Sequence, residues 1–166
     1  MKHCSRRSVL RLLCGATATS AFFGPFGAGA QWPFAPSTTP AAQKNALNAV
    51  RSQVNWVHNA TKTASNYGEQ GPASVWRTFD DLRQAYYVFK QTLTPQQLTY
   101  GANSLAELDA GLGILEEAFV NYDEDRARGQ SLASALRTMC RLLSQGTALW
   151  AQELNKTCSR LRVGWP

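Results

Sequence analysis

Apolar side chains recur every three or four residues through four successive segments of this chain, and this period is its strongest constraint on the fold. An α-helix with 3.6 residues per turn gathers such positions on one face, whereas a half-buried strand needs alternation every two residues. No segment shows sustained two-residue alternation bounded by turn signals. The chain is therefore predicted to be all-α, with no need for strands.

The four apolar stripes are separated by short polar or glycine-containing stretches. The stripes are Leu47, Val50, Val54, Val57, Thr61 and Ala64, then Val75, Phe79, Leu82, Tyr86, Phe89 and Leu93, then Leu98, Leu105, Leu108, Leu112, Leu115, Phe119 and Tyr122, and finally Leu132, Leu136, Met139, Leu143, Gly146, Trp150, Leu154 and Leu161. Short connections favour antiparallel neighbours. We expect an up-and-down four-helix bundle over residues 40–163, with long coiled-coil-like helical hairpins as the alternative.

Capping residues mark where the helices are expected to begin. Thr39 precedes a proline, and Ser131 precedes the fourth stripe, so both side chains can accept bonds from the free N–H groups of a first turn. Thr94 with Gln97 three residues later forms a capping box. The first helix is expected to end near residues 66–68.

The third stripe carries signs of an interruption. Ser104 and Glu107 form a second capping-box pattern inside it, so a kink or break is expected near Ala102. Gly111 and Gly113 stand within the same predicted helix, where each costs about 1 kcal/mol relative to alanine. Such a cost suggests the close approach of another backbone, with a flexible spot as the alternative.

The first residues of the chain have the layout of an export signal. Residues 1–11 contain four basic side chains and no acidic one, and residues 12–23 are moderately apolar. Arg6, Arg7 and Leu10 closely resemble the twin-arginine export consensus. We expect recognition by the twin-arginine export machinery, with the general secretory route as the alternative.

Small residues follow where a signal peptidase reads the chain. Ala28 and Ala30 occupy the two positions that the peptidase inspects, so cleavage is expected after Ala30. An apolar run of about a dozen residues is shorter than the roughly 20 that span a bilayer, so no stable membrane anchor is expected after cleavage. The predicted organisation is a signal peptide over 1–30, an extended lead-in over 31–39 and one helical domain over 40–163.

The formal net charge of +6 resembles the signature of a nucleic-acid-binding protein. Four of the 17 basic residues and none of the 11 acidic residues lie in the first 30, so residues 31–166 carry 13 basic and 11 acidic side chains, a net charge of +2. No nucleic-acid partner is therefore predicted. The remaining charge is uneven, because acidic residues gather over 107–125 and basic ones predominate after 130, a polarity that suits docking with a partner.

Residues 31–166 offer little for catalysis. His58 is the one histidine left, and two cysteines accompany it, which is too few for an ordinary structural zinc site. The chain has no GxSxG sequence, no glycine-rich phosphate loop and no Glu-x-x-His pair of a di-iron bundle. We predict no enzymatic activity and no catalytic, metal or cofactor-binding residue.

Cys140 and Cys158 pose a geometric question. They are 18 residues apart, which on a continuous helix is five turns and about 27 Å, whereas a disulfide needs Cα atoms within about 7 Å. They pair with each other only if the chain turns back at residues 144–147. A continuous helix leaves each thiol free or bonded to another chain, although an oxidising compartment favours pairing.

Five aromatic residues of the stripes have two interpretations. Trp76, Tyr86, Phe89, Phe119 and Trp150 either pack in the core or enclose a small apolar molecule. Core packing is favoured, because a wide aromatic face buries well between helices.

Part of the chain resembles the TrbJ-type family of conjugal-transfer proteins. The resemblance lies in the helix led by Trp76, in the Gln-Leu-Thr-Tyr-Gly-Ala-Asn-Ser-Leu sequence of residues 97–105, in the Phe-Val-Asn-Tyr sequence of 119–122 and in the Gln-Trp-Pro-Phe of 31–34. It implies a periplasmic, mostly helical and non-catalytic component of a type IV secretion apparatus, associated with the pilus and mating-pair formation.

These observations predict an exported periplasmic helical protein that acts as a non-catalytic interaction component, with other periplasmic proteins as partners. The alternative is a periplasmic bundle that binds a small apolar ligand or a non-covalent cofactor. The oligomeric state is left open.

Overall fold

Cap and turn residues divide residues 37–165 into six helical segments. The computed structural model describes residues 37–165, so the signal peptide expected over 1–30 and most of the lead-in lie outside the described residues. The segments are α2 (Pro40–Thr63), the 3₁₀ helix η1 (Ala64–Gln70), α3 (Gly71–Gln91), α4 (Pro95–Tyr100), α5 (Ala102–Ala127) and α6 (Leu132–Arg160). Residues 37–165 contain no strand, which confirms the all-α prediction.

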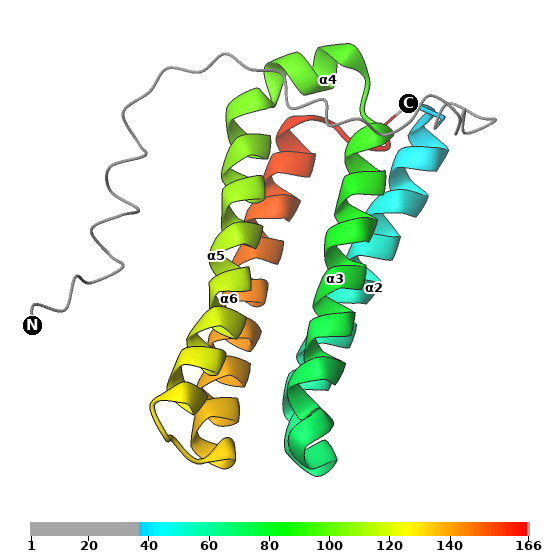
Figure 1. The fold of residues 1–166 in the computed structure, drawn as a ribbon. Helices are drawn as coiled ribbons and strands as arrows, with labels where there is room; N and C mark the ends of the chain where they lie inside the picture. The colour runs from blue at the N-terminus through cyan, green and yellow to red at the C-terminus, as the bar shows by residue number, and fades with distance from the viewer. Residues whose placement is uncertain (1–36, 166) are drawn as a thin grey trace, which may run out of the picture. The chain divides into compact units, whose positions relative to one another are not determined.

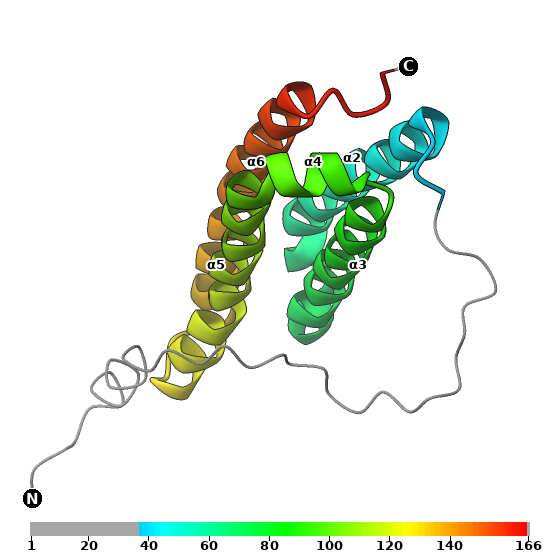
Figure 2. The ribbon, with the colours of Figure 1, turned by 90° about the horizontal axis from the view of Figure 1, so that it is seen from above.

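The four long helices lie side by side as two antiparallel hairpins (Figure 1). α3 returns along α2, the short α4 crosses one end, and α6 returns along α5. α2 also packs along α6 and joins the two hairpins, and the view from above shows α4 bridging them (Figure 2). The chain thus runs up and down four long helices. We call the end crossed by α4 the α4 end and the opposite one the far end.

The predicted helix starts are confirmed by their hydrogen bonds. The hydroxyls of Thr39 and Ser131 each accept a first-turn backbone N–H at 3.3 Å. The Thr94 hydroxyl accepts the N–H of Gln97 at 3.2 Å, and the side chain of Gln97 accepts the N–H of Thr94 at 2.9 Å. Each cap satisfies donors that a helix start leaves free.

Two details of the helix ends differ from the expectation. α2 ends at Thr63, a few residues early, and the chain tightens into η1, where Gly68 has a φ of 53° that glycine adopts without strain. The third stripe breaks at Gly101, as the sequence indicated, but the second capping box does not form. Because α5 begins two residues before Ser104, the N–H groups that Ser104 would cap are bonded within the helix.

The stripe residues form the core. The fully buried side chains include Val50, Val57, Val75, Phe79, Leu82, Tyr86, Phe89 and Leu143. Each large apolar side chain buried in this way stabilises the fold by about 1.5–3 kcal/mol. Leu98 is an exception, since it lies on α4 and remains 39% exposed.

A buried glutamine ties the α4 end together. The side-chain amide of Gln43 donates to the carbonyl of Thr92 at 3.1 Å and to the side chain of Gln97 at 2.8 Å, and its carbonyl accepts the N–H of Gly164 at 3.0 Å. Gln97 also donates to the carbonyl of Leu161 at 3.0 Å. This polar hub, Gln43 with Gln97, joins the start of α2, the end of α3, α4 and the segment after α6.

Candidate functional site

Glycines bring α5 and α6 close together. A Cβ on Gly111 would lie 3.0 Å from Cδ1 of Trp150, and a Cβ on Gly146 would overlap a methyl group of Leu115. The indole N–H of Trp150 donates to the carbonyl of Leu108 at 2.9 Å. The interior glycines of this pair therefore accommodate large side chains of the opposite helix. The close neighbour of Gly111 is a side chain and not the expected backbone, and a Cβ on Gly113 would meet nothing within 4 Å.

An apolar groove runs over this contact on the outer surface. It has a volume of about 270 Å³ and is lined by Glu107, Leu108, Gly111, Ile114, Leu115, Gly146, Leu149, Trp150 and Glu153. Ile114 is 67% exposed and Leu149 is 66% exposed. We call this surface the α5–α6 groove. Two large aliphatic side chains stand in solvent beside an apolar floor, with a carboxylate from each helix at its edge.

Large side chains and ion pairs span the gap between α3 and α5. The ammonium of Lys90 lies 2.7 Å from the carboxylate of Asp109, and the guanidinium of Arg83 lies 3.4 Å from that of Glu116. Both carboxylates belong to the acidic residues that gather over 107–125. In the structure they are half-buried partners of α3, so part of the acidic charge of α5 is neutralised within the bundle.

The five candidate aromatic residues divide into two groups. Tyr86, Phe89 and Trp150 are buried, and the rings of Tyr86 and Trp150 meet edge to face with centroids 5.3 Å apart. Burial raises the pKa of the Tyr86 phenol far above its usual value, with Asp109 adding to the effect, so this hydroxyl stays protonated. These three rings fill the core and leave no space for a ligand among themselves.

Trp76 and Phe119 lie at the edge of the bundle. Their rings meet edge to face with centroids 4.8 Å apart, and they line an open hollow of about 390 Å³ together with Pro72, Ala73, Glu116, Val120, Tyr122 and Asp123. The five predicted residues therefore do not converge on one pocket.

Both cysteines lie on α6, which is continuous from Leu132 to Arg160. The chain does not turn back at residues 144–147, so Cys140 and Cys158 do not bond to each other and both thiols are free. Burial raises the pKa of the Cys158 thiol to about 12, against a smaller lowering effect of Arg51. Burial also raises the pKa of the half-buried Cys140 thiol.

Polar side chains link α2 to α6. Nε and Nη2 of Arg51 donate to the side-chain oxygen of Asn155 at 3.2 and 2.8 Å, and Nδ1 of His58 lies 2.9 Å from the hydroxyl of Ser144. His58 is exposed on the helix surface, the position that the sequence predicted.

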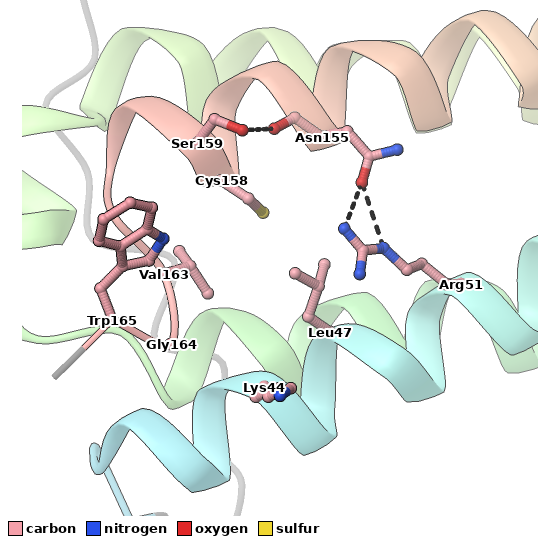
Figure 3. Close-up of a pocket in the computed structure, with 9 residues that line it drawn as sticks. All are labelled: Lys44, Leu47, Arg51, Asn155, Cys158, Ser159, Val163, Gly164 and Trp165. Atoms are coloured by element: carbon pink, nitrogen blue, oxygen red, sulfur yellow. Dashed lines mark hydrogen bonds between the residues drawn. The ribbon is translucent and has the colours of Figure 1, made fainter.

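A cavity of about 500 Å³ opens between α2 and α6 at the α4 end (Figure 3). Its walls are Lys44, Leu47 and Arg51 from α2, Asn155, Cys158 and Ser159 from α6, and Val163, Gly164 and Trp165 from the segment that follows α6. We call it the end cavity, and we call residues 161–165 the C-terminal hook. The hook leaves the helix where Arg162 has a φ of 51° and where the N–H of Val163 bonds back to the carbonyl of Cys158 at 3.0 Å.

Of the residues that build this cavity, sequence reasoning singled out only Leu47, as a stripe residue, and Cys158, as a possible disulfide partner. Gln43 continues the first stripe toward the helix start, four residues before Leu47, so a polar residue at a core position was the available signal. Lys44, Arg51 and Trp165 carried no local pattern, because they come together only when the end of the chain folds back over α2.

The predicted export signal lies outside the described residues. The export-signal residues Arg6, Arg7, Leu10, Ala28 and Ala30 precede residue 37. Within residues 37–165 no group of three or more His, Cys, Asp or Glu side chains could hold a metal ion. No helix in this part of the chain is long and apolar enough to cross a membrane.

No protein-family model matches the chain, and neither does any curated protein or solved structure.

Proposed function

We propose that this protein is an exported, non-catalytic interaction component that binds a partner protein in the periplasm through the α5–α6 groove. The observation that carries the proposal is the pair of aliphatic side chains, Ile114 and Leu149, each about two-thirds exposed beside an apolar floor. Covering a side chain of this size is worth about 1.5–3 kcal/mol. A partner that covers these two side chains would therefore bind the groove with a favourable free energy.

The shape and charge of the groove favour an amphipathic helix as the partner element. Two parallel ridges with glycines between them leave room for a third helix, which would offer apolar anchors three and four residues apart. Glu107 and Glu153 edge the groove, and Glu107 forms no ion pair with a described residue. A basic residue beside the apolar anchors would complement that edge.

The size of the native complex tests the proposal. In extract from cells that produce the protein, the unmodified protein should run as part of a complex larger than the exported chain alone. A variant with Ile114→Glu and Leu149→Glu should run alone, because two buried carboxylates oppose the docking of an apolar helix.

Val88→Glu is the matched control, since Val88 is 53% exposed and lies on α3, outside the groove. This variant should stay in the complex. The proposal fails if the groove variant remains in a complex of unchanged size, or if the unmodified chain already runs alone.

Export is a separate part of the proposal, and the sequence of residues 1–30 supports it. A variant with Arg6→Lys and Arg7→Lys should stay in the cytoplasm as the uncleaved precursor, because the twin-arginine machinery requires the arginine pair. The exported chain should begin at Gln31 when its N-terminus is sequenced. Unchanged export of the variant would favour the general secretory route.

We also propose that the partner belongs to a conjugative type IV secretion apparatus. The similarity to TrbJ-type proteins at Trp76, at residues 97–105 and at residues 119–122 supports this assignment. Genes for conjugal transfer should lie beside the gene for this protein, and its deletion should lower plasmid transfer. A neighbourhood without transfer genes would contradict the assignment but would leave the groove proposal standing.

The second candidate function is the binding of a small molecule, and the end cavity is the observation that favours it. Native mass spectrometry of protein purified from the periplasm separates the two functions. Additional bound mass at one equivalent per chain would favour ligand binding, and a bare chain that co-purifies with a partner protein would favour the interaction role.

A further inference from the structure

We propose that the end cavity is a binding site for a small organic anion whose acidic group is carried on an apolar ring system. The site lies at the α4 end between α2 and α6, whereas the proposed partner-binding groove lies between α5 and α6. The inference rests on the second candidate function, whose ligand class it names, and not on the proposed interaction role.

The lining of the cavity is cationic. Lys44 and Arg51 both face it, and none of its nine lining residues is acidic. Neither cation forms an ion pair with a carboxylate of residues 37–165, in contrast to Arg83 and Lys90 on α3. Two positive charges at the edge of a partly enclosed space attract an anion more strongly than they would in open solvent.

Arg51 is held in a fixed orientation. Its Nε and Nη2 donate to the side-chain oxygen of Asn155, while the backbone carbonyl of Asn155 accepts the hydroxyl of Ser159 at 2.9 Å (Figure 3). A guanidinium has five N–H donors, and these two contacts leave the remainder available to a ligand. A pre-oriented guanidinium suits a carboxylate or sulfonate, which accepts two parallel hydrogen bonds.

The remaining walls are apolar and include an exposed indole. Leu47 and Val163 face the interior of the cavity, and Trp165, which is 70% exposed, stands at its edge. An indole offers a large flat surface on which another ring stacks. The combination of two cations with an aliphatic floor and an indole selects for an anion with an apolar ring body.

The wall formed by the C-terminal hook is anchored to the bundle. The N–H of Gly164 donates to the buried side chain of Gln43 at 3.0 Å, and a Cβ on Gly164 would lie 3.4 Å from that of Lys44. The hook is thus packed against α2 and held by the polar hub. The volume of about 500 Å³ falls in the usual range for small-molecule sites.

Cys158 provides a reporter inside the site. Its sulfur points into the cavity (Figure 3), whereas Cys140 lines a different hollow with Thr61 and Leu136. A ligand in the end cavity should therefore shield one thiol of α6 and leave the other unaffected.

The experiment compares two fluorescent probes that differ in their anionic group. The full chain is titrated with 8-anilinonaphthalene-1-sulfonate and with its uncharged analogue N-phenyl-1-naphthylamine, and alkylation by N-ethylmaleimide is followed at each cysteine by peptide mass spectrometry. The sulfonate should slow alkylation of Cys158 and not of Cys140. A variant with Lys44→Gln and Arg51→Gln should bind the sulfonate about tenfold more weakly and the uncharged probe within about twofold of the unmodified chain.

Arg77→Gln is the control, because Arg77 is an exposed cation on α3 outside the cavity. This variant should bind both probes as the unmodified chain does, and circular dichroism should show all three proteins folded. The proposal is overturned if the sulfonate leaves Cys158 unprotected, if the double variant loses no affinity for it, or if both probes lose affinity equally.

Discussion

On one side of α6 the helix meets α5 through glycines and large apolar side chains, and on the other side exposed polar contacts join it to α2 beside the shared apolar core. Trp150 lies over Gly111, and Leu115 lies over Gly146, so α5 and α6 are in close apolar contact. On the α2 side an exposed arginine pairs with an asparagine, and a histidine lies beside a serine. We call these two interfaces the α5 seam and the α2 seam.

The two seams differ in what they contribute to the stability of the fold. Apolar burial contributes most of the free energy of folding, whereas exposed polar contacts contribute little. The close apolar contacts of the α5 seam therefore stabilise α6 more than the exposed polar contacts of the α2 seam do. The α2 seam carries two cations that form no ion pair with a described residue, two free thiols and a cavity at the α4 end.

The largest loss of stability is expected from a variant that disrupts the α5 seam. Trp150→Ala should lower the free energy of unfolding by about 3–5 kcal/mol, because it empties a large buried volume and removes the bond to the carbonyl of Leu108. Urea unfolding followed by circular dichroism measures the loss. Leu149→Ala, one residue away but exposed, should change stability by no more than about 0.5 kcal/mol. Equal losses for the two variants would contradict the apolar account of this seam.

A smaller loss of stability is expected when the contacts of Gln43, which anchor the C-terminal hook at the α4 end, are removed. Gln43→Ala should cost about 1–3 kcal/mol, because it leaves the carbonyl of Thr92 and the N–H of Gly164 without their partner. Hydrogen exchange at Gly164 should become faster as the C-terminal hook detaches. Asn45→Ala, at an exposed position of α2, should leave that exchange rate unchanged. An unchanged rate in the Gln43 variant would refute the anchoring role of the polar hub.

A gain in stability is expected at the core-facing side of α6. The hydroxyl of Thr147 is buried without a hydrogen-bond partner among the described residues. Thr147→Val keeps the shape and removes the unpaired group, so stability should rise by about 1 kcal/mol. The control is Thr92→Val, which should bring no gain because the Thr92 hydroxyl donates to the carbonyl of Phe89 at 2.7 Å. Thermal unfolding of both variants decides the matter, and a loss at Thr147 would show that its hydroxyl does have a partner.

The smallest effect on stability is expected within the α2 seam. Arg51→Ala should change the free energy of unfolding by no more than about 0.5 kcal/mol, because its contact with Asn155 is exposed. The substitution should have a clearer effect on the ionisation of the Cys158 thiol. Arg51 lowers the pKa of the Cys158 thiol, so the variant should hold less thiolate at any given pH. The pH profile of Cys158 alkylation should move to higher pH, and a move to lower pH would contradict the assignment.

Much of the fold could be read from the sequence because it rests on local patterns. The spacing of residues such as Val50, Phe79 and Leu143 marks the buried face of each helix, and Thr94 with Gln97 marks a helix start. These signals act within a turn or two of one helix. The early end of α2 and the unformed capping box at Ser104 arose where neighbouring turns competed for the same backbone groups.

The proposed binding surfaces were less accessible to sequence reasoning. The α5–α6 groove depends on Gly111 and Gly146 meeting side chains of the opposite helix, which requires the register between two helices. The end cavity depends on the chain turning back after α6, so that Trp165 lies over α2. Gln97 was recognised as part of a cap, but its bond to the carbonyl of Leu161 joins residues far apart in sequence.

The central claim is that the α5–α6 groove, on the outer surface over the α5 seam, binds a partner protein, and that the α2 side of α6 does not. A photoreactive amino acid placed at single exposed positions of α6 in producing cells tests this directly. Leu149 and Leu142, two turns apart on the same helix face, should give adducts with one partner protein, and Asn155 on the α2 side should give none. Adducts from position 155 with none from 142 or 149 would contradict the account.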